Sequence, residues 1–120
     1  MQKNKCILVY GLSDDEINKL EKAKFKVLNI TNDMANMKLK DILGKVDNRD
    51  ENLELPDEKV ILFNGYGNNE MRTTIKAVRN VINGGMLAVV TPISINWTFK
   101  YLLEHLIEER AFANGEKRER

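Results

Sequence analysis

The sequence predicts an α/β protein with a three-layer architecture around a four-stranded, mostly parallel sheet of strand order 2-1-3-4. Two observations lead to this prediction. Short apolar runs alternate four times with amphipathic stretches, and the two halves of the chain resemble each other. The 120 residues, of which 42% are hydrophobic, are enough for one core of ordinary size. We therefore expect a single domain over residues 1–113, built from βαβα repeats at 5–44 and 59–110, with a charged linker over 45–58 and a disordered tail over 114–120.

The first half contains two strands and two helices. Residues 6–10 form a continuous apolar run, which is typical of a strand buried on both faces. Ser13 and Glu16 have the spacing of a capping box, so a helix is expected to begin there. Residues 26–30 predict a second, more polar strand. Residues 34–43 predict a second helix, which a glycine ends.

The second half repeats this order. Residues 59–64 predict a strand and residues 68–83 a helix with an apolar stripe. A fourth strand is expected over residues 86–90. It ends before Pro92, because proline has no amide hydrogen for the strand ladder. The last helix is expected over residues 96–110.

The two halves align without gaps over their first strand and helix. Residues 7–23 fall on residues 61–77 at an offset of 54, and Gly11 and Gly65 are equivalent. The second strand and helix align at an offset of 60. The identities at this larger offset are Thr31 with Thr91, Asn36 with Asn96, Lys40 with Lys100 and Leu43 with Leu103. We interpret the pattern as a duplicated βαβα unit.

Duplication also predicts the strand arrangement. Right-handed crossovers in each half, joined back to back, give four parallel strands in the order 2-1-3-4. The apolar run of residues 86–90 then lies at an edge, although it is too apolar for an unprotected edge strand. Either a helix covers it or another chain pairs with it. We expect a homodimer that uses this edge or the adjoining helix with Leu102 and Leu106.

The second half also carries a recognisable pattern over residues 59–109. A Thr-Pro pair follows the fourth strand, and Asn-Trp opens a leucine-rich helix. This resembles a small, uncharacterised bacterial and archaeal family that is classed only as a domain of unknown function. The resemblance implies a fold boundary and no activity. The first half resembles a degenerate copy, with Asn32 in place of the proline and Met37 in place of the tryptophan.

A ligand site is predicted where the strand order reverses, between the first and third strands. Each flanking loop has a glycine and leads into a helix N-terminus, whose free amides suit a small anion such as phosphate or carboxylate. The alternative is that the glycines only form tight turns and that the polar residues only satisfy backbone groups. Asp14 and Asp15 disfavour an anion at the first loop. The expected ligand-binding residues are Gly11, Ser13, Asn64, Gly65, Tyr66, Gly67, Asn68, Thr91 and Asn96, the last also as the cap of the final helix.

Composition excludes several classes of function. The net charge of +1 gives no basic field for nucleic acid, and no apolar run is long enough to span a membrane. One cysteine and one histidine cannot close a metal site, and one cysteine cannot form an internal disulfide, so a reducing cytoplasm is expected. No catalytic residues or cofactor are predicted. Cys6 and Trp97 are expected in the core, and His105 is expected to be solvated or half-covered. The hypothesis is a small-anion binding or regulatory module, with a self-associating interaction domain without catalytic activity as the alternative.

Overall fold

The computed structural model describes residues 5–44 and 54–113. The predicted tail and most of the predicted linker lie outside this part of the chain. The chain divides into two compact units, which are considered separately below. The sheet unit consists of Met1–Thr31 and Pro56–Thr91, and the helical unit consists of Asn32–Leu55 and Pro92–Arg120. Each unit therefore contains one segment from the first predicted repeat and one from the second. The single domain made of two repeats stays a prediction.

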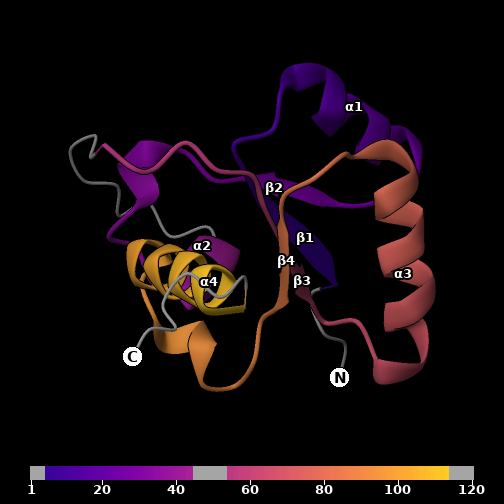
Figure 1. The fold of residues 1–120 in the computed structure, drawn as a ribbon. Helices are drawn as coiled ribbons and strands as arrows, with labels where there is room; N and C mark the ends of the chain where they lie inside the picture. Colours follow the sequence, from indigo (N-terminus) through magenta and orange to yellow (C-terminus); the bar gives the residue numbers. More distant parts are fainter. Residues whose placement is uncertain (1–4, 45–53, 114–120) are drawn as a thin grey trace. The chain divides into compact units, whose positions relative to one another are not determined.

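The sheet unit contains four strands in the predicted order β2-β1-β3-β4 (Figure 1). Their bounds are Cys6–Tyr10 for β1, Val27–Asn29 for β2, Val60–Asn64 for β3 and Met86–Val89 for β4. The pairs β1–β2 and β3–β4 are parallel. The α/β class, the strand order and a mostly parallel sheet are therefore confirmed.

The central pair departs from the prediction of four parallel strands, because β1 and β3 are antiparallel. Tyr10 lies opposite Val60, and Cys6 lies opposite Asn64. The crossover rule that gave parallel strands applies within each βαβ segment and does not constrain how two such segments are joined. As a result, β3 begins at the same end of the sheet at which β2 finishes.

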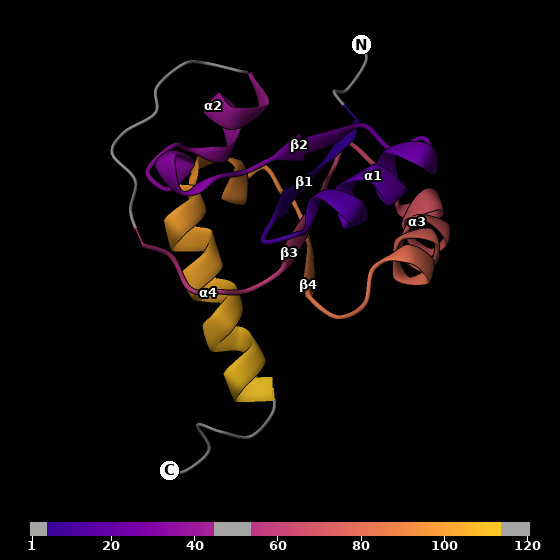
Figure 2. The ribbon, with the colours of Figure 1, turned by 90° about the horizontal axis from the view of Figure 1, so that it is seen from above.

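Two helices cover one face of this sheet, namely α1 (Asp14–Lys22) and α3 (Asn68–Val81), which lie side by side in Figure 1 and Figure 2. Their contact residues form one buried core with the strands, which consists of Ile7, Val9, Leu20, Ile61, Phe63, Val78 and Ile82. The predicted capping box at Ser13 is confirmed and starts α1. The sheet unit by itself thus has two layers, the sheet and the helix pair.

Burial separates the central strands from the edge strands. Every residue of β1 and all of β3 except Asn64 are buried, whereas all residues of β2 and β4 are half-buried or exposed. Val89 at the end of β4 has 47% of its surface exposed. The predicted central position of the two most apolar strands is therefore confirmed, and β4 is an apolar edge strand.

In its described part, the helical unit contains two 3-10 turns and two helices. These are the 3-10 turns η1 (Asn32–Met34) and η2 (Ser94–Asn96) and the helices α2 (Leu39–Leu43) and α4 (Phe99–Ala113). The predicted helix over residues 34–43 is thus wrong as one continuous helix, and the last helix begins three residues later than predicted.

Reciprocal hydrogen bonds between two segments explain these interruptions. The Leu39 amide donates to the Trp97 carbonyl over 3.0 Å, and the Phe99 amide donates to the Met37 carbonyl over 3.0 Å. Lys38 and Thr98 form an antiparallel bridge. Because these backbone groups bond across the unit, the segments before α2 and α4 are extended and not helical.

Candidate functional site

The two loops predicted to form one ligand site lie at opposite ends of the sheet. The loop Gly11–Ser13 follows β1 at the end where β3 begins, and the loop Asn64–Gly67 follows β3 at the other end. Because β1 and β3 are antiparallel, their carboxyl ends do not meet. The expectation that both loops flank one site is therefore wrong, and each loop has to be considered as a separate candidate.

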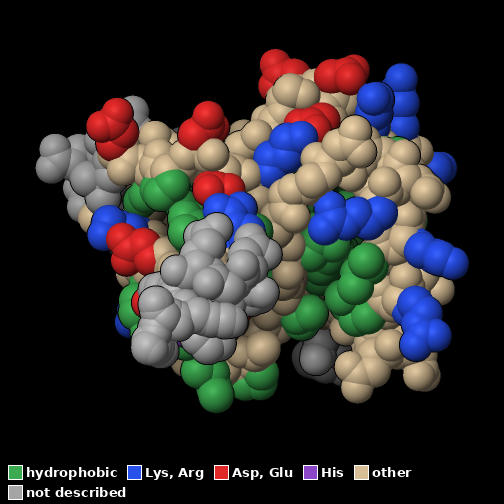
Figure 3. Space-filling model, in the orientation of Figure 1, with side chains coloured by type: hydrophobic (Ala, Val, Ile, Leu, Met, Phe, Trp, Pro, Cys, Tyr) green, Lys and Arg blue, Asp and Glu red, His purple; other side chains and the backbone are tan. Residues whose placement is uncertain are grey.

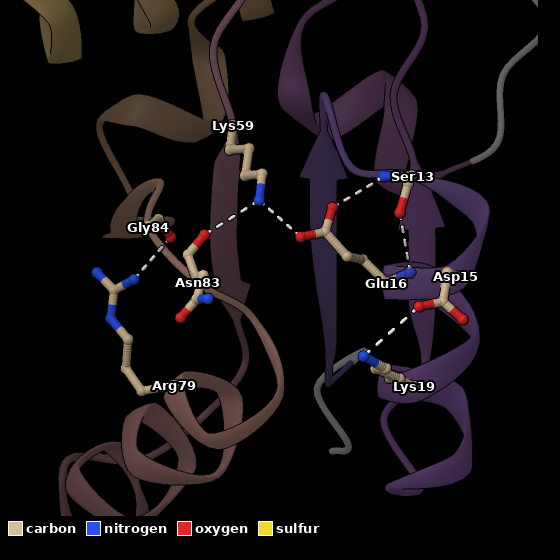
Figure 4. Close-up of polar contacts among 8 residues, drawn as sticks. All are labelled: Ser13, Asp15, Glu16, Lys19, Lys59, Arg79, Asn83 and Gly84. Atoms are coloured by element: carbon tan, nitrogen blue, oxygen red, sulfur yellow. Dashed lines mark hydrogen bonds and ion pairs between the residues drawn. The ribbon is translucent and has the colours of Figure 1, made fainter.

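The first loop is closed by a carboxylate from its own helix (Figure 4). The Ser13 amide donates to Glu16 Oε1 over 3.0 Å, and the Ser13 hydroxyl accepts from the Glu16 amide over 3.2 Å. Lys59 Nζ donates to Glu16 Oε2 over 2.6 Å and to the Asn83 carbonyl over 3.0 Å. Lys59 directly precedes β3, so this cluster links the start of β3, in the second half, to α1, in the first half.

The second loop repeats this arrangement with other residues. The Gly67 amide donates to Glu70 Oε1 over 2.9 Å, and Lys5 Nζ donates to Glu70 Oε2 over 2.8 Å. The Lys5 ammonium also lies 5.2 Å from the centroid of the Tyr66 ring. That ring packs edge-on against Phe63, at a centroid distance of 5.9 Å. Lys5 directly precedes β1, as Lys59 directly precedes β3.

These contacts define the electrostatics of both loops. The hydrogen bond from Lys59 is the largest factor holding the pKa of Glu16 below its ordinary value, and the Ser13 amide adds to the effect. The hydrogen bond from Lys5, followed by the Gly67 amide, lowers the pKa of Glu70. Both carboxylates are therefore ionised at neutral pH and occupy the position at a helix N-terminus that an external anion would take. An anionic ligand at either loop has to displace one of them.

The glycines of the two loops are required to different degrees. Gly11 has a φ of 81°, and a Cβ atom there would overlap the carbonyl oxygen of Glu58. Turn geometry and this close approach fully account for a glycine at that position. Gly67 has a φ of −76°, and a Cβ atom there would meet only the Glu70 side chain, at 3.9 Å. The backbone does not require glycine at position 67.

The other predicted site residues are spread over the two units. Thr91 is exposed at the end of the sheet unit, while Asn96 belongs to the helical unit. Asn96 does not cap the last helix, because its Nδ2 donates to the Pro92 carbonyl over 3.5 Å. The Thr98 hydroxyl takes that role and accepts from the Tyr101 amide over 3.2 Å. Asn68 is exposed as the first residue of α3, and Asn64 and Gly65 are half-buried between β3 and the loop.

A row of aromatic rings, which begins at Trp97 just before α4 and continues along α4, was missed by the sequence analysis. Trp97, Tyr101 and His105, which we call the aromatic row, are spaced four residues apart and contact one another. Trp97 is half-buried, so its expected place in the core is wrong, and Tyr101 is 51% exposed. His105 is half-buried, as expected, and its ring contacts both Trp97 and Tyr101. Their regular spacing is the signal that identifies the row.

Lys5 and Lys59 were missed as well. Neither residue type nor local sequence distinguishes them from other lysines of the chain. Their separation equals the repeat offset of 54 residues, and that offset is the signal that pairs them.

Metal and membrane functions gain no support from the described residues. Among residues 5–44 and 54–113, no group of three or more His, Cys, Asp or Glu side chains is placed to hold a metal ion. Within the same ranges, no helix is long and apolar enough to cross a membrane. Cys6 is buried in β1, as the sequence predicted.

Comparison with known proteins gives one match. A family model described as a domain of unknown function (DUF3783) matches residues 59–112, a little under half of the chain. This agrees with the expected resemblance of the second half to an uncharacterised family, while the degenerate copy in the first half stays a prediction. The comparisons with curated proteins and with solved structures each gave no match.

Proposed function

We propose that this chain is a protein-interaction domain that self-associates through the free edge of β4 and has no catalytic activity of its own. The observation that carries the proposal is the apolar character of an edge strand. Its residues are Met, Leu, Ala and Val, and Val89 is 47% exposed. Figure 3 shows hydrophobic side chains gathered on the surface between β4 and α3. Strands of this composition at an edge favour pairing with another chain.

The backbone of β4 supports the same proposal. The Met86 amide donates to the Lys59 carbonyl and the Val90 amide to the Phe63 carbonyl, so these residues bond towards β3. Because backbone groups alternate in direction along a strand, the amides and carbonyls of Leu87 and Val89 point away from β3. In the described part of the chain, β3 is the only strand that pairs with β4.

A second copy of the chain is the partner that fits this edge best. Two β4 strands related by a two-fold axis pair antiparallel, and each supplies the same apolar side chains and the same outward backbone groups. Such a contact extends the four-stranded sheet into a continuous sheet of two copies. The edge is favoured over the adjoining helix because Leu102, one of the two leucines expected on a helical interface, is only 6% exposed.

We also infer that the sheet unit is an internal duplication, as the sequence offsets predict. Leu8 and Leu62 are equivalent at the offset of 54 and lie directly opposite each other. Exchanging the two halves therefore leaves the pairing of β1 with β3 unchanged. The parallel pairs correspond in the same way, with Ile7 opposite Val27 and Ile61 opposite Leu87. Duplication explains why the sheet has two related edges, of which β4 is the longer and the more apolar.

A small anion at the second loop is the alternative proposal. Lys5 supports it, because this half-exposed ammonium lies beside the capped N-terminus of α3. Glu70 opposes it, since its carboxylate already holds both Lys5 and the Gly67 amide. If an anion binds at the second loop, inorganic phosphate in large excess should raise the melting temperature of the protein, and Lys5→Met should remove that rise. No rise in the melting temperature would exclude this alternative.

The mass of the chain in solution tests self-association. At micromolar concentration, sedimentation equilibrium should give twice the chain mass of 13.8 kDa. Val89→Lys should return the protein to monomers, because the charge would be placed within the paired edges. Asn29→Lys, an exposed position on the opposite edge strand β2, is the matched control and should leave the dimer intact. A wild-type monomer would overturn the proposal.

A further inference from the structure

The exposed side of α3 carries a stripe of basic residues. Arg72, Lys76 and Arg79, which we call the basic stripe, are spaced four and three residues apart and are all exposed, so they lie along one side of the helix. The Arg79 guanidinium donates to the Gly84 carbonyl over 2.7 Å and to the Gly85 carbonyl over 3.3 Å (Figure 4). Because these glycines directly precede β4, the basic stripe lies on the side of α3 that is next to the free edge of the sheet.

The basic stripe is a surplus of positive charge within the described sheet unit. Glu70, the one carboxylate of α3, pairs with Lys5. Glu16 pairs with Lys59, whose ammonium adds a further cation close to the start of β4. Residues 82–90, which comprise β4 and the residues before it, contain no acidic residue. The remaining described carboxylates of the unit lie on α1 or directly before β3, namely Asp14, Asp15, Glu21, Asp57 and Glu58.

The centre of the sheet shows how helices meet across an antiparallel strand pair. The strands β1 and β3 are antiparallel, and the helices that follow them, α1 and α3, lie side by side on one face (Figure 2). α1 contains four carboxylates and two lysines, whereas α3 contains one carboxylate and three cations. The two neighbouring helices therefore have net charges of opposite sign.

The proposed dimer repeats this geometry with two identical helices. A two-fold axis that pairs the β4 strands antiparallel is perpendicular to the sheet, so both copies of α3 lie on the same face. Because α3 connects β3 to β4, the two copies are about two strand spacings apart, or about 10 Å, which is close to the distance of packed helices.

This arrangement brings like charges together at the interface. A helix that connects two parallel strands runs antiparallel to them, so Arg79 lies near the start of β4 and Arg72 lies towards its end. In the antiparallel dimer, Arg72 of one copy therefore faces Arg79 of the partner subunit. Unlike the pair of α1 and α3, this helix pair has cations on both sides, and their repulsion opposes association unless an anion lies between them.

We propose that the dimer binds a multivalent phosphate between its two α3 helices, with Arg72 of one copy and Arg79 of the partner subunit forming each of two equivalent sites. The inference rests on the proposed self-association through β4. Guanidinium groups suit phosphate because their planar donors bind two of its oxygens at once. The two carbonyl bonds of Arg79 use two of its five N–H donors and leave its charge uncompensated.

Inorganic tripolyphosphate tests the proposal on the full-length protein. In sedimentation equilibrium, a saturating concentration should lower the dissociation constant of the dimer about tenfold. The reference sample contains sodium chloride at the same ionic strength, so that general screening of the repulsion is equal in both samples. Lys5→Met should retain the effect, which distinguishes this site from an anion bound at the second loop.

One variant and a matched control assign the effect to the basic stripe. Arg72→Gln should remove most of the response to tripolyphosphate, because each site loses one of its two arginines. Without tripolyphosphate, the same variant should lower the dissociation constant of the dimer about threefold, because it removes repulsion between the copies. A variant that failed to fold would not give this tighter dimer. Lys22→Gln removes one cation from an exposed position of α1 and should leave both values unchanged.

Three results would overturn the inference. A dimer whose dissociation constant does not respond to tripolyphosphate would contradict the phosphate site and leave the proposed β4 interface intact. An undiminished response in Arg72→Gln would place the bound anion elsewhere on the protein. A protein that is monomeric both with and without tripolyphosphate would contradict the proposed function, and this inference with it.

Discussion

The two halves of the sheet unit follow the same plan but differ at their edges and loops. Each half places a strand, a capped helix and a parallel edge strand in the same order. The first half ends in the short strand β2, with an exposed Asn29, whereas the second half ends in the apolar strand β4. The two edges of the sheet therefore differ in apolar character, and the proposed self-association rests on this difference.

The ion pairs beside the two loops also differ, because the pair at the second loop is more exposed to solvent. In the Lys59–Glu16 pair the side chains are 33% and 18% exposed, and Lys59 also bonds the Asn83 carbonyl. In the Lys5–Glu70 pair they are 48% and 42% exposed. We therefore expect the Lys59–Glu16 pair to stabilise the protein more than the Lys5–Glu70 pair, because solvent screens the exposed pair more strongly.

The largest difference between the halves is expected for their loop glycines. Gly11→Ala should lower the free energy of unfolding by about 3 kcal/mol or more, because it combines a strained φ with an overlap against the Glu58 carbonyl. Gly67→Ala should change it by no more than about 0.5 kcal/mol, because φ is ordinary and space is available. Urea denaturation of both variants measures the two values. Equal losses at the two positions would contradict this difference.

A smaller difference is expected for the two lysines. Lys59→Met should lower the free energy of unfolding by about 1 kcal/mol, since it removes the ammonium that donates to Glu16 Oε2 and to the Asn83 carbonyl. Lys5→Met should produce a smaller loss, because the side chains of Lys5 and Glu70 are both about half exposed to water. Chemical denaturation compares the two under identical conditions. A larger loss for Lys5→Met would show that exposure does not determine the contribution of these pairs.

The pH dependence of stability is expected to be the smallest effect. Because the pKa values of Glu16 and Glu70 are lowered in the folded protein, both groups stabilise it above the ordinary glutamate value of 4.5. That contribution is lost as the pH falls through the lowered values. The urea midpoint, measured from about pH 7 to about pH 3, should therefore decrease on acidification. Lys59→Met should make the urea midpoint depend less steeply on pH. If the pH dependence of the midpoint is the same in this variant, Glu16 does not contribute to it.

Local patterns predicted much of the sheet unit. The apolar runs identified all four strands, and Ser13 with Glu16 identified the start of α1, because capping and burial act over a few residues. The duplicated pattern also gave the strand order. It did not give the direction of β3 relative to β1, because the junction of two halves is not governed by any local rule.

The candidate sites were harder to predict, because they depend on contacts between distant segments. The Glu16–Lys59 ion pair joins residues 43 positions apart, so neither residue is notable in its own sequence context. Trp97 was expected in the core because large aromatic side chains usually bury there. The backbone bond from Leu39 instead holds Trp97 in an extended segment, with its ring against Tyr101. Only the three-dimensional arrangement reveals this.

The most direct test of the proposed function is the hydrogen exchange of the Leu87 and Val89 amides, measured by NMR at increasing protein concentration. Both amides point away from β3, so they are available for pairing with a second β4 strand. The proposal predicts that their exchange slows as the concentration rises, while the outward amide of Val27 on β2 exchanges at a constant rate. Exchange at Leu87 and Val89 that does not depend on concentration, in a sample that contains dimers, would contradict an interface at β4.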